Sequence, residues 1–305
     1  MVGGPIATSW RSRRFPRVKK EASKRLAPRW LNALCLTAAL LGTYTADSQA
    51  ATVRVVEQSV RGGTLTTPVY SAAPGEHNEL TVYMLGGATH FSDSGAIVDP
   101  GQRCESLGAG IARCLGPPPL FFPRVEAGDA ADSVAMNLDD GFVLAGEGDD
   151  EVTGGRGLFG GGGDDLLRTG ASQPNLSGGP GNDRLQASST IPVMHGGPGN
   201  DVLRGGPDGG DLNGGEGNDR IYGEGGRDYL NGGPGNDRLV DRSGPGASQF
   251  DDYQMRGGSG ADSIDSVNGR RERIDCGPGR DAIRADGIDR LKDCERVRRA
   301  RPRGR

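Results

Sequence analysis

The chain has 305 residues, of which 54 are glycine and only 5% are aromatic, and its formal net charge at pH 7 is −4. This composition excludes a large aliphatic core of the usual globular kind. A glycine-rich chain without a repeat would be a disordered linker, whereas a fixed sequence period indicates a solenoid.

Residues 1–50 have the pattern of a secretory signal peptide. Residues 1–29 are strongly basic, an apolar run follows from Trp30 to Thr45, and Ser48-Gln49-Ala50 is a small-x-small cleavage site. The apolar run has about 16 residues, against the roughly 20 that span a membrane, so we expect cleavage rather than the alternative, a membrane anchor. Cleavage would leave 27 basic against 38 acidic residues. That balance argues against nucleic acid and anionic lipid as partners and favours cations.

Beyond the signal peptide, the cysteines fall into two local pairs. Cys104 and Cys114 are ten residues apart, and Cys276 and Cys294 are eighteen residues apart. In an exported protein this spacing predicts two disulfides, Cys104–Cys114 and Cys276–Cys294. A metal site, the alternative, needs the tighter C-x₂-C spacing.

Residues 51–141 are expected to form a β-rich N-terminal cap region. Runs of β-branched residues, such as residues 52–56 and 79–84, are separated by turn formers such as Arg61-Gly62-Gly63. The last part of this region, residues 125–138, has the pattern of an imperfect solenoid coil.

A nonapeptide repeat fills residues 160–240. Every block of nine counted from Gly160 has an apolar residue at its eighth position: Leu167, Leu176, Leu185, Met194, Leu203, Leu212, Ile221, Leu230 and Leu239. Alternate blocks open with a near-identical hexapeptide, GGGGDD at 160–165, GGPGND at 178–183, 196–201 and 232–237, and GGEGND at 214–219. In a strand only alternate residues face inward, so the eighth-position side chains are expected to stack into a thin core.

The hexapeptides have the chemistry of calcium turns. Glycines permit a tight turn and bring backbone carbonyls together, and Ca²⁺ takes six to eight oxygens from carboxylates and carbonyls. Each turn offers about half a coordination shell, and the next turn on the same side supplies the rest. We therefore expect several Ca²⁺ ions, held by the sixth-position acids and by the second and fourth glycines: Asp165, Asp183, Asp201, Asp219, Asp237, Gly161, Gly163, Gly179, Gly181, Gly197, Gly199, Gly215, Gly217, Gly233 and Gly235. Further candidate ligands lie in other, less regular turns: Asp150, Asp228, Asp262 and Asp281.

The pattern G-G-x-G-x-D-x-U-x resembles the RTX, or haemolysin-type, calcium-binding repeat family. The resemblance implies an all-β fold, a right-handed parallel β-roll in which two nonapeptides make one coil and alternate turns fall on opposite edges. The intervening turns have Pro174, Pro192, Gly210 and Asp228 at their sixth positions. We therefore predict one edge with a ladder of about four Ca²⁺ and a second edge that is largely metal-free, where Asp208 and Asp228 could support one weaker site.

The predicted roll extends beyond its regular core. We expect it to cover residues 142–265, with the regular core at 160–240 and a loop insertion at 241–256. Residues 266–305 are expected to form a disulfide-tied C-terminal cap and a basic tail.

The sequence shows no catalytic constellation. It lacks H-E-x-x-H, a G-x-S-x-G elbow and a phosphate loop ending in G-K-[ST]. The leading hypothesis is a secreted, extracellular, non-enzymatic calcium-binding protein whose roll folds on Ca²⁺, without nucleic acid as a partner and without a membrane span. One alternative is an adhesin that presents the 241–256 loop to a cell-surface or matrix partner. The other is a hydrolase with an unrecognised site in residues 51–140.

Overall fold

The computed structural model describes residues 50–60, 63–96, 98–101, 103–108, 110–115, 122–189, 191–243 and 253–300. These residues belong to one compact unit, residues 48–305. The expected signal peptide, the middle of the loop insertion and the end of the basic tail lie outside the described residues.

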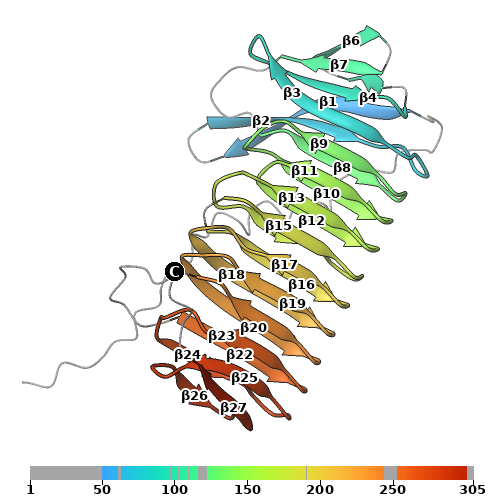
Figure 1. The fold of residues 1–305 in the computed structure, drawn as a ribbon. Coiled ribbons are helices and arrows are strands. Elements are labelled where there is room, and N and C mark those ends of the chain that lie inside the picture. Colours follow the sequence, from blue (N-terminus) through green and yellow to red (C-terminus); the bar gives the residue numbers. More distant parts are fainter. Residues whose placement is uncertain are drawn as a thin grey trace, which may run out of the picture. The chain divides into compact units, whose positions relative to one another are not determined.

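Two sheets contain the described strands, as Figure 1 shows. In order along the first sheet, sheet A, lie β5 (Val98–Pro100), β1 (Ala51–Val60), β2 (Gly63–Ser71), β8 (Arg124–Gly128), β10 (Phe142–Glu147), β12 (Gly157–Gly162), β14 (Asn175–Ser177), β16 (Val193–Pro198), β18 (Gly209–Glu216), β20 (Arg227–Pro234), β22 (Tyr253–Ser259), β24 (Glu272–Asp275) and β26 (Arg290–Lys292).

The second sheet, sheet B, has a matching order. It contains β6 (Cys104–Gly108), β7 (Ile111–Cys114), β4 (Ala88–Asp93), β3 (Glu79–Leu85), β9 (Ser133–Met136), β11 (Glu151–Gly154), β13 (Leu166–Thr169), β15 (Arg184–Ala187), β17 (Val202–Arg204), β19 (Arg220–Gly223), β21 (Arg238–Asp241), β23 (Ser263–Ser266), β25 (Ala282–Asp286) and β27 (Arg296–Ala300). A search of the described residues for a helix long and apolar enough to cross a membrane finds none.

From β8 onward the chain is a parallel β-solenoid. Each coil contributes one strand to each sheet, so β14 pairs in parallel with β16 in sheet A while β15 pairs with β17 in sheet B. The pairing brings equivalent repeat positions together, as with Leu176 beside Met194 and Leu185 beside Leu203. The prediction of an all-β parallel solenoid is confirmed.

The core between the sheets is thin, as the repeat predicted. All nine eighth-position side chains, Leu167 to Leu239, are at most 2% exposed. They come alternately from the two sheets, and each strand of the regular coils contributes one large apolar side chain. Burial of one such side chain contributes only about 1.5–3 kcal/mol, while ordering each residue of the backbone costs about 1–2 kcal/mol. The coils therefore need another source of stability.

The N-terminal strands continue both sheets. β1 and β2 form an antiparallel hairpin, and β2 pairs in parallel with β8. In sheet B, β3 pairs with β9 in parallel and with β4 in antiparallel fashion. The predicted Cys104–Cys114 disulfide is present and joins β6 to β7. In each sheet, therefore, one strand of the N-terminal region pairs with a strand of the first coil.

Stacked glycines set the close approach of successive coils. The fourth glycine of the turn at 196–201, Gly199, has φ of +141°, a conformation that side-chain-bearing residues rarely adopt. A Cβ there would occupy the space of the carbonyl oxygen of Gly181 in the preceding coil. The same conflict would arise at Gly181, Gly217 and Gly235. Glycine is therefore required at this position by both dihedral angle and space.

Replacing Gly199 by alanine should be strongly destabilising. We expect Gly199→Ala to lower the free energy of unfolding in calcium by about 3 kcal/mol, because both strain and overlap with backbone must be relieved. Denaturant unfolding followed by circular dichroism measures the change. The matched control is Gly170→Ala, at an exposed glycine whose nearest neighbour to a new Cβ is the Ser188 Oγ at 3.4 Å. Equal effects of the two substitutions would contradict the stacking argument.

Candidate metal-binding edge

One edge of the solenoid carries a column of buried aspartates. This first edge consists of the turns that lead from a sheet A strand to the next sheet B strand. On it, the backbone N–H of Asp183 donates to Asp201 Oδ1, and that of Asp201 donates to Asp219 Oδ1, each at 2.8 Å. The same bond links successive members of a set that we call the aspartate ladder: Asp132, Asp150, Asp165, Asp183, Asp201, Asp219, Asp237, Asp262 and Asp281.

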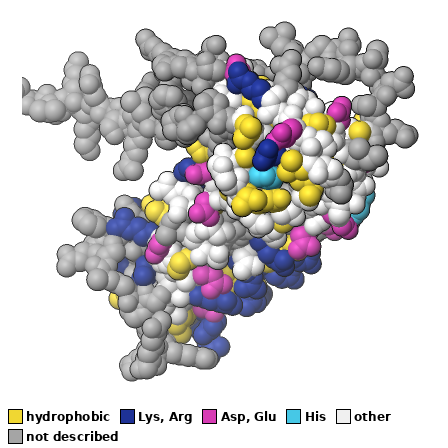
Figure 2. Space-filling model, turned by 90° about the horizontal axis from the view of Figure 1, so that it is seen from above, with side chains coloured by type: hydrophobic (Ala, Val, Ile, Leu, Met, Phe, Trp, Pro, Cys, Tyr) yellow, Lys and Arg dark blue, Asp and Glu magenta, His cyan; other side chains and the backbone are white. Residues whose placement is uncertain are grey.

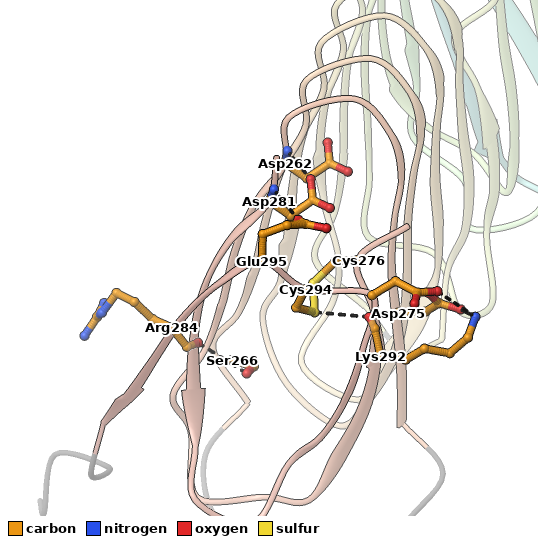
Figure 3. Close-up of a disulfide and its surroundings, with 10 residues drawn as sticks. Asp262, Ser266, Asp275, Cys276, Asp281, Arg284, Lys292, Cys294 and Glu295 are labelled. Carbon is orange, nitrogen blue, oxygen red and sulfur yellow. Dashed lines mark hydrogen bonds and ion pairs between the residues drawn. A yellow bond between two sulfur atoms is a disulfide. The ribbon is translucent and has the colours of Figure 1, made fainter. Parts of the chain in front are cut away.

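Different side chains close the ladder at its two ends. At the N-terminal end, Asn78 donates to Asp132 Oδ1 from its backbone N–H at 2.7 Å and from Nδ2 at 2.9 Å. At the C-terminal end, Glu295 Oε2 accepts the backbone N–H of Asp281 at 2.9 Å. Figure 3 shows Asp262, Asp281 and Glu295 one below another, near the predicted Cys276–Cys294 disulfide, which is present. The column therefore runs without interruption from the cap to the last coil.

The second carboxylate oxygen of every ladder aspartate is buried without a hydrogen-bond partner. This holds for Oδ2 of all nine residues from Asp132 to Asp281. In the regular turns this oxygen lies against the first glycine of the same turn, so that a Cβ on Gly178 would overlap Asp183 Oδ2 and one on Gly196 would overlap Asp201 Oδ2. The first glycine is thus needed to make room for the carboxylate.

These oxygens fit a calcium ion. A buried ionised oxygen without a partner is costly unless a proton or a cation neutralises it, and carboxylates with backbone carbonyls are the ligands that Ca²⁺ prefers. Among the described residues no group of three or more His, Cys, Asp or Glu side chains could hold a metal. Neighbouring ladder carboxylates are one coil apart, about 4.8 Å. Any ion here must therefore draw on glycine carbonyls as well as on carboxylates.

Burial also changes the acidity of the ladder. Removal from water, with a smaller contribution from neighbouring carboxylates, raises the pKa of Asp183, Asp201 and Asp237 to about 7. The same causes raise the pKa of Asp165 and Asp262 to about 6. Calcium needs the ionised form, so ion binding must displace protons from this edge.

The spacing of the first edge is constant, whereas that of the opposite edge varies. Residues that pair in register across sheet A, such as Phe142, Gln254 and Arg273, each lie eight residues before their ladder aspartate. Between Arg124 and Asp281 the second edge, where sheet B strands lead back to sheet A, absorbs all differences in length. It is shortened between Asp150 and Gly157 and lengthened by the insertion between Asp237 and Gln254. The turn that ends at Asp150, only fifteen residues before Asp165, therefore joins the same ladder.

An exposed amide ladder runs beside the aspartates. Asn200 donates to Asn182 Oδ1 from its backbone N–H at 3.0 Å and from Nδ2 at 2.9 Å, and Asn218 repeats both bonds to Asn200. Asp149 starts this series by accepting the backbone N–H of Asp164, and Asp164 in turn accepts from Asn182. The fifth-position residues thus stack the turns on one another through their own hydrogen bonds.

Arginines line the outer face of sheet B next to this edge. Arg184, Arg220 and Arg238 are exposed and occupy one register column. Figure 2 shows Lys and Arg side chains gathered in a stripe with acidic side chains nearby. The pKa of Asp164 is lowered by its hydrogen bonds from Asn182 and also by the charge of Arg184. Positive charge beside this edge thus favours the ionised form of Asp164.

Comparison with known families agrees with this geometry. A family model for the RTX calcium-binding nonapeptide repeat matches in four copies, over residues 158–185, 193–209 and 205–239. Residues 158–239 are RTX calcium-binding repeats. Searches of curated proteins and of solved structures return no match to the chain. The RTX match implies Ca²⁺ as the ion, and it covers the part of the solenoid where the ladder is most regular.

Most of the predicted ligands are brought to one edge. Asp150, Asp165, Asp183, Asp201, Asp219, Asp237, Asp262 and Asp281 all belong to the aspartate ladder. Asp228 lies on the second edge, buried, where burial raises its pKa to about 8. Sequence reasoning missed three members of the first edge. Asp132 could have been found eighteen residues before Asp150, whereas Asn78 and Glu295 carry no repeat signal.

The raised pKa values predict how the calcium-free chain responds to pH. The ladder carboxyls have folded pKa values of up to about 7 against an ordinary 3.8. The folded state therefore holds more protons than the unfolded state between about pH 4 and pH 7. The stability that the protonated ladder carboxyls give to the folded state is fully present below this window and is lost as pH rises through about 7. We expect the far-UV β signal of the chelated protein to be stronger near pH 4 than near pH 7, and the opposite trend would contradict these shifts.

Proposed function

We propose that the protein is a secreted, non-enzymatic calcium-binding protein whose β-roll folds when Ca²⁺ binds along the first edge. One observation carries this proposal. Each ladder aspartate uses Oδ1 to hold the preceding coil and leaves Oδ2 buried beside glycine backbone without a partner. A cation on that side of the carboxylate supplies the interaction that the thin core lacks.

The ligands form one site between each pair of neighbouring turns. Asp183 and Asp201 provide the acidic oxygens of one such site, and the carbonyls of Gly179 and Gly181 lie against the glycines of the following coil. The turns that end at Asp150, Asp262 and Asp281 have the same ladder bonds and partnerless oxygens as the five regular turns. We therefore extend the proposed ladder beyond the four ions expected from residues 160–240.

Folding on calcium suits an exported chain. Metal binding to a site that exists only in the folded state contributes its binding free energy to folding. Extracellular calcium modules bind at roughly 10⁻⁴ to 10⁻³ M, so the roll would stay unfolded at cytoplasmic calcium and order outside the cell. The two disulfides agree with an oxidising compartment.

The division of the chain into a signal peptide at 1–50, a cap at 51–141, a roll at 142–265 and a C-terminal cap at 266–305 stays a prediction. The adhesin alternative depends on the 241–256 loop, of which residues 244–252 lie outside the described residues. The hydrolase alternative is tested by activity in a fragment that lacks the roll.

Calcium should switch the secondary structure of the chain. We expect the far-UV circular dichroism of the chelated protein at neutral pH to be that of a largely unfolded chain. Addition of Ca²⁺ should restore the β signal with a midpoint of roughly 10⁻⁴ to 10⁻³ M, whereas Mg²⁺, which demands a smaller octahedral shell, should not. A β signal that is the same with and without chelator would contradict folding on metal.

A substitution in the middle of the ladder should weaken this switch. In Asp201→Asn the Oδ1 acceptor remains, but an amide replaces the oxygen that would bind calcium. We expect the calcium midpoint of folding to rise several-fold. The control is Asp211→Asn, the same chemical change at an exposed position on sheet A, which should leave the midpoint unchanged. Equal midpoints for the two variants would remove Asp201 from the proposed ligands.

A further inference from the structure

The second edge changes character along the solenoid. In the early coils the inward position at the start of each sheet A strand is held by Pro174, Pro192 and Gly210, which carry no charge. In the late coils the equivalent column holds Glu272, which is 0% exposed, and then Asp289, which is 6% exposed. Acids thus appear inside the second edge first at Asp228, which is buried and pairs in register with Gly210, and then at Glu272 and Asp289 in the last coils.

Glu272 belongs to a buried group that we call the C-terminal acid cluster. Its other members are Asp286, Asp289, Ser266 and Asn268, all of them buried. They come from β23, β24 and β25 and from the loops that follow β23 and β25, so the last coils meet here. The surrounding segment, residues 266–272, reads SVNGRRE and has no nonapeptide pattern.

Most polar atoms of this cluster have partners. Asp289 Oδ1 accepts the backbone N–H of Glu272 at 3.1 Å, and its Oδ2 accepts from the Asp286 N–H at 2.7 Å and from Ser266 Oγ at 3.1 Å. Asp286 Oδ2 accepts from the backbone N–H of Asn268 at 3.0 Å. Three carboxylate oxygens are left buried without a partner: Glu272 Oε1, Glu272 Oε2 and Asp286 Oδ1.

Nearby cationic side chains do not satisfy these three oxygens. Arg299 Nη1 donates to the backbone carbonyls of Asp286 and Asp289. Arg270 Nη1 donates to the carbonyl of Gly226, and its charge lowers the pKa of Asp241, which accepts from Asn268 Nδ2. These donations go to backbone carbonyls, whereas the Glu272 carboxylate lies beside Asp289 and Asn268.

We propose that the C-terminal acid cluster is a second calcium site, separate from the aspartate ladder. The side-chain atoms of this cluster that could bind a metal are carboxylate, hydroxyl and amide oxygens. This set suits Ca²⁺ and lacks the nitrogen and sulfur ligands that Zn²⁺ prefers. Glu272 offers both oxygens, as in a bidentate carboxylate ligand. As on the first edge, carboxylates alone are too few to coordinate an ion. Backbone or side-chain carbonyls and water would therefore complete the coordination shell.

The site has a structural consequence for the end of the roll. The Cys276–Cys294 disulfide lies beside Asp262, Asp281 and Glu295, so it ties the last coils at the first edge (Figure 3). An ion at Glu272 and Asp286 would tie the same coils at the second edge. The two crosslinks together would stop the terminal coils from separating.

Counting ions in full-length variants tests this site. Glu272→Gln should lower the number of Ca²⁺ bound per chain by one, measured by equilibrium dialysis in saturating calcium. The matched control is Glu151→Gln, the same change at an exposed residue that pairs with Arg168 on sheet B, and it should leave the count unchanged. An unchanged count in Glu272→Gln overturns the site and means that a proton neutralises the cluster.

A second measurement covers the case in which Glu272→Gln fails to fold. Crystals of the unmodified protein grown in calcium should show anomalous density between Glu272 and Asp286. Density along the first edge but not at this position overturns the second site and leaves the ladder intact. Density at this position but not on the first edge supports the second site and removes the proposed ladder, so the two proposals fail separately.

Discussion

Each ladder aspartate has to satisfy two carboxylate oxygens in different ways. Oδ1 accepts the backbone N–H of the preceding ladder aspartate, so the carboxylate joins neighbouring coils. Oδ2 is buried by the same packing and has no donor. Because the core adds only one large apolar side chain per strand, the balance between folded and unfolded chain depends on what neutralises this column of oxygens.

The glycines and the variation in coil length follow from this constraint. The first glycine leaves room for Oδ2, and the second and fourth leave room for the carbonyls of the preceding coil. Any insertion on the first edge would separate neighbouring carboxylates, and between Arg124 and Asp281 that edge keeps a fixed length. Insertions and deletions accumulate at the second edge, which carries no such ladder.

Much of the solenoid could be predicted from the sequence. The eighth-position residues Leu167 to Leu239 recur without interruption, and strand periodicity leaves only one way to bury them. The eighteen-residue recurrence of Asp165 to Asp237, together with the two-nonapeptide coil that the RTX resemblance implies, predicted a shared edge. The pairing of the cysteines could also be predicted, because each pair is close in sequence.

Other features could not be predicted because they depend on contacts without a repeat. Asn78 reaches Asp132 only because β3 happens to pair with β9, and Glu295 closes the ladder after a shortened last coil. Asp289 contacts both Glu272 and Asp286 through irregular loops that no spacing rule describes. The sequence likewise does not show which carboxylate oxygen stays free, since this depends on backbone hydrogen bonds between coils.

The number of calcium ions bound to the intact chain tests the central claim most directly. Native mass spectrometry of the full protein in calcium should find more ions than the regular core alone would hold. The expected number is at least one for each adjacent pair of the turns that end at Asp150, Asp165, Asp183, Asp201, Asp219, Asp237, Asp262 and Asp281. A folded chain that binds no calcium would contradict the account, because the partnerless oxygens of the ladder would then be neutralised by protons.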